Sequence, residues 1–293
     1  MSKYYDLLLS ANTKEKSEKV IIWISILSFL IHLLIIGIIN AGIIKPSFES
    51  ELLTNPISAI YTPFTFILLF EVYLLVYHIP FSTSDYIAKQ YEIITLILIR
   101  RIFKDLANLD LTINWFEDRY DLQFTYDIVS TLFLFFLIYY FHKLNGKGVS
   151  IKPIDTLPLR VQVFIKRKKI MASLLVPVII IMAIYSFVDW AGSLLYGYQA
   201  TEGTTFVDLN NIFFDEFFTL LILTDVLLLL FSFFHTSKFH VVIRNSGFII
   251  STILIRISFS IDGFLNNILI IVAVLFGVLI LLTNQQYGKL KDR

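Results

Sequence analysis

The feature that most restricts the fold of this sequence is a series of apolar runs, each long enough to cross a lipid bilayer. About 20 apolar residues in an α-helix span the hydrocarbon core. Hydrophobic residues make up 57% of the chain and charged residues 16%, whereas soluble domains have roughly 45–50% and about 25%. The sequence therefore predicts an all-α, polytopic integral membrane protein.

Eight stretches qualify as transmembrane helices. The third is the weakest, because its uncharged core is only Ile93 to Ile99, between Glu92 and Arg100. Pro80 and the polar residues 82–85 end the second span and offer an N-cap to the third. The predicted spans are 20–44, 60–79, 86–106, 125–140, 170–196, 211–234, 245–259 and 264–282.

The distribution of Lys and Arg predicts the topology, since cytoplasmic loops carry an excess of both. With the N-terminus in the cytoplasm, the inside segments hold 18 of the 24 Lys and Arg residues, eight of them in 143–169. A third helix on the surface would move that basic segment outside. We therefore expect eight spans in the cell membrane with both termini cytoplasmic. The short run Leu7 to Leu9 does not form a signal peptide.

The two halves of the chain resemble each other at polar positions. Glu71 corresponds to Asp225, Leu98-Ile99-Arg100 to Leu254-Ile255-Arg256, and Thr83-Ser84 to Thr236-Ser237. Chance is the alternative, because Leu, Ile and Phe make any two membrane helices look alike. We predict two parallel four-helix repeats related by an axis along the membrane normal. The expected divisions are 1–19 (tail), 20–142 (first unit), 143–169 (basic linker), 170–283 (second unit) and 284–293 (tail).

Four charged residues within the spans are the principal site candidates, because charge at a helix centre costs about 2.5–3.5 kcal/mol. Glu71 is nine residues from Pro80, roughly 14 Å, and Arg100 is fourteen from Tyr86, roughly 21 Å. Long side chains can bridge that difference in depth. The predicted intramembrane pairs are Glu71–Arg100 and Asp225–Arg256, which either line a pathway or only fix helix register.

Secondary candidates are Glu92, Arg101, His32 and His78. We expect the Arg101 side chain to snorkel to the outer lipid headgroups. The alternative is that it forms part of a vestibule that attracts anions. The two histidines could relay protons, but a histidine among apolar residues is more often a hydrogen-bonded packing residue.

Several functions find no support in the sequence. Cysteine is absent, which excludes disulfides, thiolate catalysis and Cys-ligated metals. Phosphate-binding, HExxH and GxSxG motifs are absent as well. The net charge of +1 indicates no nucleic-acid partner. We expect no catalytic residue, cofactor or metal site, although an enzyme acting on lipid stays an alternative.

Part of the first unit resembles the four-helix voltage-sensor module. Glu71 in FEVYLL and Glu92 in QYEIITLIL look like the acids of that module's second and third helices. Span 125–140 contains no arginine, however. The resemblance therefore implies no voltage sensing by gating charges, and it assigns no family.

These observations predict a transporter or channel-like protein whose charged pathway serves an ion, a proton or a small anionic solute. The alternative is a non-transporting subunit or scaffold that packs against other membrane proteins. The expected partners are the lipid bilayer, such a solute, and a membrane protein or a second copy of the chain.

Overall fold

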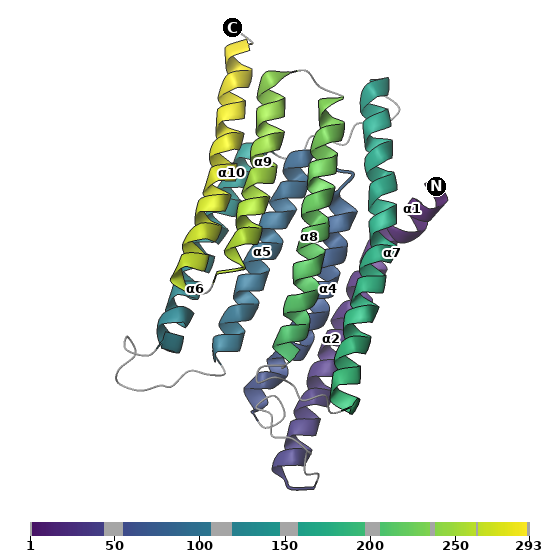
Figure 1. The fold of residues 1–293 in the computed structure, drawn as a ribbon, viewed down its shortest axis with the longest axis vertical. Helices are drawn as coiled ribbons and strands as arrows, with labels where there is room; N and C mark the ends of the chain where they lie inside the picture. The colour runs from purple at the N-terminus through teal and green to yellow at the C-terminus, as the bar shows by residue number, and fades with distance from the viewer. Residues whose placement is uncertain are drawn as a thin grey trace.

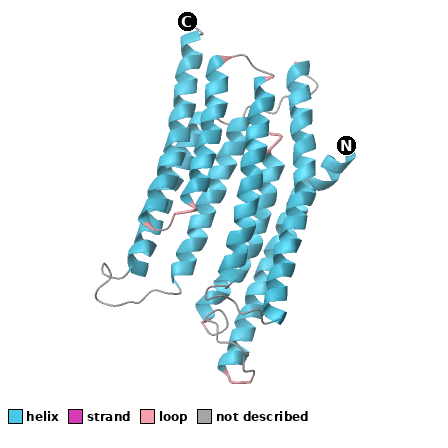
Figure 2. Cartoon of the chain, viewed as in Figure 1, coloured by secondary structure: helices cyan, strands magenta, loops and turns pink. Residues whose placement is uncertain are grey.

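The computed structural model describes residues 2–43, 55–106, 119–146, 158–196, 206–234, 238–261 and 263–291. Within these ranges the regular structure is entirely helical (Figure 2). The elements are α1 (Ser2–Leu8), α2 (Ala11–Asn40), the 3-10 turn η1 (Pro56–Ile60), α4 (Tyr61–His78), α5 (Thr83–Leu106), α6 (Arg119–Asn145), α7 (Leu159–Tyr196), α8 (Phe206–Phe233), α9 (Phe239–Ser258) and α10 (Phe264–Lys291).

The long helices form two layers of antiparallel neighbours (Figure 1). One layer has the order α2, α4, α5, α6, and the other has the order α7, α8, α9, α10. The layers meet where α6 packs on α10, α5 on α9 and α4 on α7. We call the end of the bundle at which α4, α6, α8 and α10 terminate the upper end, as in Figure 1.

The surface of the bundle is apolar, as expected for helices that face lipid. Seven of the described helices are long and apolar enough to cross a membrane. Large hydrophobic side chains lie on the outside, such as Trp23 (72% exposed) and Phe135 (69% exposed). Exposed apolar patches of this extent are not tolerated on soluble monomers. The fold is that of a helical membrane protein.

Helix α5 is not among those seven, since it carries seven charged residues, yet it lies in the interior of the bundle. Its consecutive residues Tyr86, Ile87 and Ala88 are all buried. Successive helical residues point about 100° apart, so protein surrounds most of the helix there. A helix that contacts protein rather than lipid does not need an apolar surface.

Each predicted span corresponds to a helix, and most of the helices are longer than predicted. The exception is α4, which is two residues shorter than the span 60–79. Helix α7 begins at Leu159, so the basic residues up to Lys169 are helical and not a loop. Helices α1, α2 and α10 likewise extend into the predicted tails. Charged ends of a span do not interrupt helical hydrogen bonding, so hydropathy marks the apolar core of a helix rather than its ends.

The arrangement of the layers does not confirm the axis along the membrane normal that the sequence predicted for the repeat. A twofold axis along the membrane normal would reverse the helix order of one layer relative to the other. Here equivalent helices of the two units face each other, α5 with α9 and α6 with α10. The sequence repeat stays a prediction. Its Thr236-Ser237 element lies outside the described residues.

A close approach between α5 and α10 depends on glycine. The Tyr91 hydroxyl forms a hydrogen bond with Ser251 Oγ on α9 at 2.7 Å, and Ser251 donates to the Ala273 carbonyl of α10 at 2.6 Å. A Cβ atom at Gly277 would lie 1.8 Å from the Tyr91 hydroxyl oxygen. Only a residue without a side chain leaves room for this three-helix contact.

Gly277→Ala is expected to destabilise the bundle by about 1–3 kcal/mol, the usual cost of overpacking. Tyr91→Phe removes the hydroxyl that clashes and should restore part of the loss. The measurement is the unfolding midpoint in detergent. Gly37→Ala on α2, which meets nothing within 4 Å, is the matched control and should not lower it. Equal midpoints for the two alanine variants would contradict this packing.

Candidate functional site

Polar side chains on α5 connect it to most of its neighbours. Lys89 and Glu92 contact α4 and α6, Gln90 contacts α8, and Arg101 contacts α6 and α10. These contacts fall into three clusters: a charged chain near the upper end, a buried carboxylate site between α5 and the second layer, and an arginine network near the lower end.

The charged chain runs from α4 across α5 to α6. Lys89 Nζ lies 3.7 Å from Glu71 Oε2 and 2.9 Å from Glu92 Oε2. The other oxygen of Glu92 lies 2.8 Å from His142 Nε2. Exposure of the side chains rises along this chain, from 13% at Glu71 to 35% at Glu92 and 48% at His142.

The ion pair at Glu71 is with Lys89, and not with Arg100 as predicted from the sequence. The geometry of the α4–α5 hairpin explains why Glu71 pairs with Lys89. Glu71 is seven residues before the end of α4 at His78, and Lys89 is six residues after the start of α5 at Thr83. The two therefore lie at nearly equal depth, whereas Arg100 is seventeen residues into α5, roughly 25 Å.

The buried carboxylate site centres on Asp225 of α8, which is 2% exposed. Gln90 Nε2 donates to Asp225 Oδ2 at 3.1 Å. Thr252 Oγ1 lies 3.5 Å from the same oxygen, but its hydroxyl already donates to the Ile249 carbonyl at 2.9 Å. A carboxylate can accept about four hydrogen bonds, so these contacts satisfy Asp225 poorly as an anion.

Two small cavities adjoin Asp225. The volume that the centre of a water molecule can occupy is about 20 Å³ in one and about 10 Å³ in the other. About 10–15 Å³ of such volume accommodates one water molecule. The larger cavity, toward the upper end, is lined by polar residues that include Tyr86, Lys168, Ser232 and Asn245. The smaller is mostly apolar and includes Arg256. Asp225 and Arg256 thus share a cavity, while the hydrogen bond to Asp225 comes from Gln90.

Lys168 is the cation that the structure brings into the interior. It is 4% exposed, whereas Lys166 and Arg167 on the same turn of α7 are exposed. Its Nζ donates to the Phe81 carbonyl at 2.9 Å and lies 5.0 Å from the centre of the Phe164 ring. Lys168 is nine residues into α7 and Asp225 eight residues from the end of α8, so their depths agree within roughly 2 Å.

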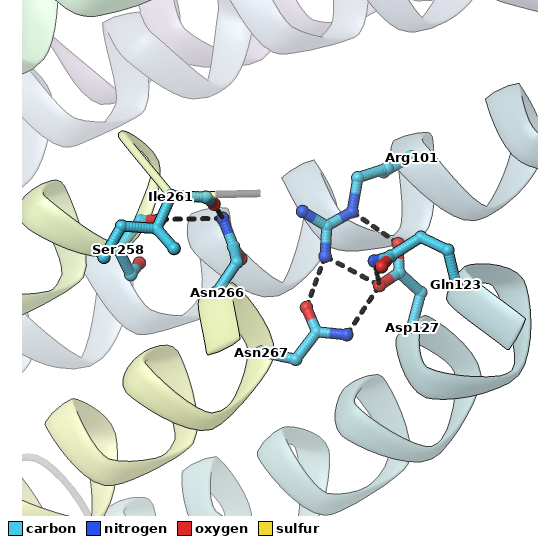
Figure 3. Close-up of polar contacts among 7 residues, drawn as sticks. All are labelled: Arg101, Gln123, Asp127, Ser258, Ile261, Asn266 and Asn267. Atoms are coloured by element: carbon cyan, nitrogen blue, oxygen red, sulfur yellow. Dashed lines mark hydrogen bonds and ion pairs between the residues drawn. The ribbon is translucent and has the colours of Figure 1, made fainter. Parts of the chain in front are cut away.

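The arginine network joins α5, α6 and α10 (Figure 3). It lies near the lower end, since Arg101 is five residues before the end of α5 at Leu106. Two nitrogens of Arg101 donate to the two oxygens of Asp127 on α6, one at 2.7 Å. Asp127, fully buried, also accepts from Gln123 at 2.7 Å and from Asn267 at 2.6 Å. Arg101 donates in turn to the Asn267 side-chain oxygen. Arg101 therefore points inward, and the predicted snorkelling is wrong.

The remaining candidates have local roles. His32 Nδ1 lies 2.6 Å from Thr62 Oγ1 and joins α2 to α4. His78 Nδ1 lies 2.7 Å from the Leu74 carbonyl one turn earlier, and because a carbonyl only accepts, this nitrogen carries the proton. Arg100 is half-buried on α5. Among the described residues no three His, Asp or Glu side chains gather as metal ligands.

No family model, curated protein or solved structure matches this chain. Its class follows from the fold alone. The chain is a multi-pass helical membrane protein. Among the residues that the structure describes, the buried carboxylates are Asp121 and Asp127 on α6 and Asp225 on α8. Asp127 is held by a charged donor and two amides, and Asp225 by the amide of Gln90.

The Arg101–Asp127 pair is expected to hold α5 on α6. Asp127→Ala should destabilise the protein by about 3–5 kcal/mol, because it leaves the arginine charge without its main partner. Replacing both residues, Arg101→Met with Asp127→Leu, should recover most of that loss. Chemical unfolding in detergent micelles measures each variant.

Glu92→Gln is the matched control, since the Glu92 pairs are partly exposed and such pairs contribute under about 1 kcal/mol. A double variant no more stable than Asp127→Ala would show that the network does more than neutralise the arginine.

Proposed function

We propose that the protein is a transporter or channel-like membrane protein with Asp225 as the point at which a small ion or proton binds. The observation that supports this is a carboxylate held between helices, with cavities on two sides and few hydrogen bonds. A charge at this depth costs several kcal/mol. An isolated packing role would be served at lower cost by an apolar residue.

The proposal includes α5 as an eighth span. Its length of 24 residues corresponds to roughly 36 Å, enough to cross the hydrocarbon. Its burial within the bundle and its antiparallel packing on α4 and α6 support a crossing. With α5 counted, the basic segments gather on one side, which is the cytoplasmic side by the positive-inside rule.

The two acids identified from the sequence differ in their surroundings. Glu71 has a cation within 4 Å, so it is neutralised where it lies. Asp225 has Lys168 on the wall of a shared cavity and a neutral amide as its hydrogen-bond donor. We therefore assign the binding role to Asp225 and a supporting role to Glu71.

A non-transporting subunit is the second candidate, favoured by the position of α2. This helix packs mainly on α4 and η1 at the edge of the bundle. Only 11% of the residues in its apolar stretch are buried. A second membrane protein could cover that face. A stoichiometric partner that co-purifies, together with an isolated chain that moves no ion, would support this role instead.

The direct test is flux through the purified protein in liposomes. Proton, sodium, potassium and chloride gradients are imposed separately, and flux above that of protein-free liposomes is expected for at least one. Glu71→Gln with Asp225→Asn should reduce it to the protein-free level, and Asp225→Asn alone should do the same.

Glu15→Gln removes an exposed carboxylate of α2 and serves as the control, with unchanged flux expected. Flux that persists in the double variant would remove the proposed role of these acids. Absence of flux in every gradient would remove the transport function itself.

A further inference from the structure

We propose that Asp225 takes up a proton from the upper end of the bundle, through the cavity that it shares with Lys168. This inference rests on the proposed function and specifies the species bound and the direction of access. It follows from cavity size, from the hydrogen bonds of Asp225 and from the polarity of the two cavities.

The size of the site restricts what can bind. The two cavities beside Asp225 have room for about one water molecule each. A small organic anion does not fit. The volume also leaves no room for a metal cation together with its water ligands, and Lys168 on the wall of the larger cavity opposes a second cation there. A proton carried by one water molecule fits the volume.

The hydrogen bonds of Asp225 suit a carboxyl group that gains and loses a proton. Asp127 accepts four hydrogen bonds from Arg101, Gln123 and Asn267, which stabilise its charged form. The donors to Asp225 are neutral and more distant: Gln90 Nε2 lies 3.1 and 3.4 Å from its two oxygens, and Thr252 Oγ1 lies 3.5 Å from one of them. Asp127 and Asp225 thus differ in how strongly their surroundings oppose protonation, and of these two buried acids Asp225 is the one that can accept a proton more readily.

The groups that face Asp225 come from the helices around it. They are Tyr86 on α5, Lys168 on α7, and Arg256 on α9, with Arg244 of α9 close to Lys168. Helix α4 contributes the apolar Leu75. Lys168 lies on the wall of the upper cavity together with Asp225, and its positive charge attracts the carboxylate.

In the proton transfer, a hydronium ion at the upper surface passes its proton through the water-sized cavity to Asp225 Oδ2. The carboxylate then becomes a neutral carboxyl group. One water molecule is left in place of the hydronium ion. Asp225 then carries no charge, and its attraction to Lys168 is lost.

The polarity of the cavities sets the direction. The upper cavity is lined by Thr83, Tyr86, Lys168, Ser232 and Asn245, among others. Below Asp225 the walls are mainly apolar, with Ile93, Phe218 and Ile255 among them, and the polar residues there are Gln90, Thr252 and Arg256. Water enters polar cavities and avoids apolar ones. We therefore place the route of the proton on the upper side of Asp225, where more of the lining residues are polar.

Infrared difference spectroscopy of the detergent-purified protein tests the protonation without any flux. Lowering the pH is expected to produce the C=O stretching band of a protonated carboxyl group, absent in Asp225→Asn and unchanged in Glu15→Gln. Gln90→Leu, which keeps Asp225 but removes its donor, should shift the band to higher frequency. Identical pH-difference spectra for the wild type and both Asp225→Asn and Gln90→Leu would overturn the inference.

Single cysteines test the direction of access, since the chain contains no cysteine of its own. Silver ions are close to water in size and block thiols. A cysteine at Ser232→Cys should be blocked by silver before denaturation, and one at Ile255→Cys should not, as read by maleimide labelling of the unfolded protein. Equal blocking at both positions, or blocking at Ile255→Cys alone, would overturn access from the upper end.

The proton site at Asp225 and the transport function can be disproved separately. A carboxyl band that depends on Asp225, without flux in any gradient, would leave the proton site standing and remove the transport function. If sodium, potassium or chloride flux is retained in Asp225→Asn and the carboxyl band is not seen, the proton site is removed and the transport function stands.

Discussion

The low dielectric constant of the bilayer is the constraint on which the rest of this structure depends. A charged side chain there must find its partners within the protein. Helix α5 contains seven charged residues and could not face lipid on all sides. The bundle surrounds it with α4, α6 and α9, and the polar residues of those helices and of α8 and α10 complete its hydrogen bonds. The two-layer architecture follows from the need to enclose this helix.

The enclosed charges serve two different purposes. At the lower end, Asp127 and Arg101 satisfy each other and two amides complete the network, so this cluster joins three helices. Nearer the upper end, Glu71, Lys89, Asp225 and Lys168 lie six to nine residues from the upper ends of their own helices. In this upper group Asp225 lies next to a cavity, and its hydrogen-bond donor is a neutral amide. Stability and proposed function thus reside at different depths.

The sequence predicted the helices well because apolar length is a local property. It placed eight spans, and it singled out Glu71 and Asp225 as unusual. It did not predict their partners, because depth was measured from assumed helix ends and repeat symmetry suggested arginine for both. It also missed Asp127 and Asn267, whose importance comes from their contact with Arg101, 26 and 166 positions away in the chain. Lys168 belongs to a basic run that was interpreted as a signal of topology, so its burial was not predicted. Counting residues from the α7 start would have shown that Lys168 and Asp225 share a depth.

The central claim is that α5 crosses the membrane inside the bundle, since the depth of every buried charge depends on it. A nitroxide spin label at Leu96→Cys tests this directly, because Leu96 lies thirteen residues into α5 and is 37% exposed. In lipid nanodiscs, power saturation compares collisions with oxygen, which concentrates in hydrocarbon, and with a water-soluble nickel complex. The account predicts strong oxygen collisions and weak nickel collisions, as for a label at the lipid-facing Phe135→Cys. Strong nickel collisions at Leu96→Cys would place α5 at the membrane surface and contradict the account.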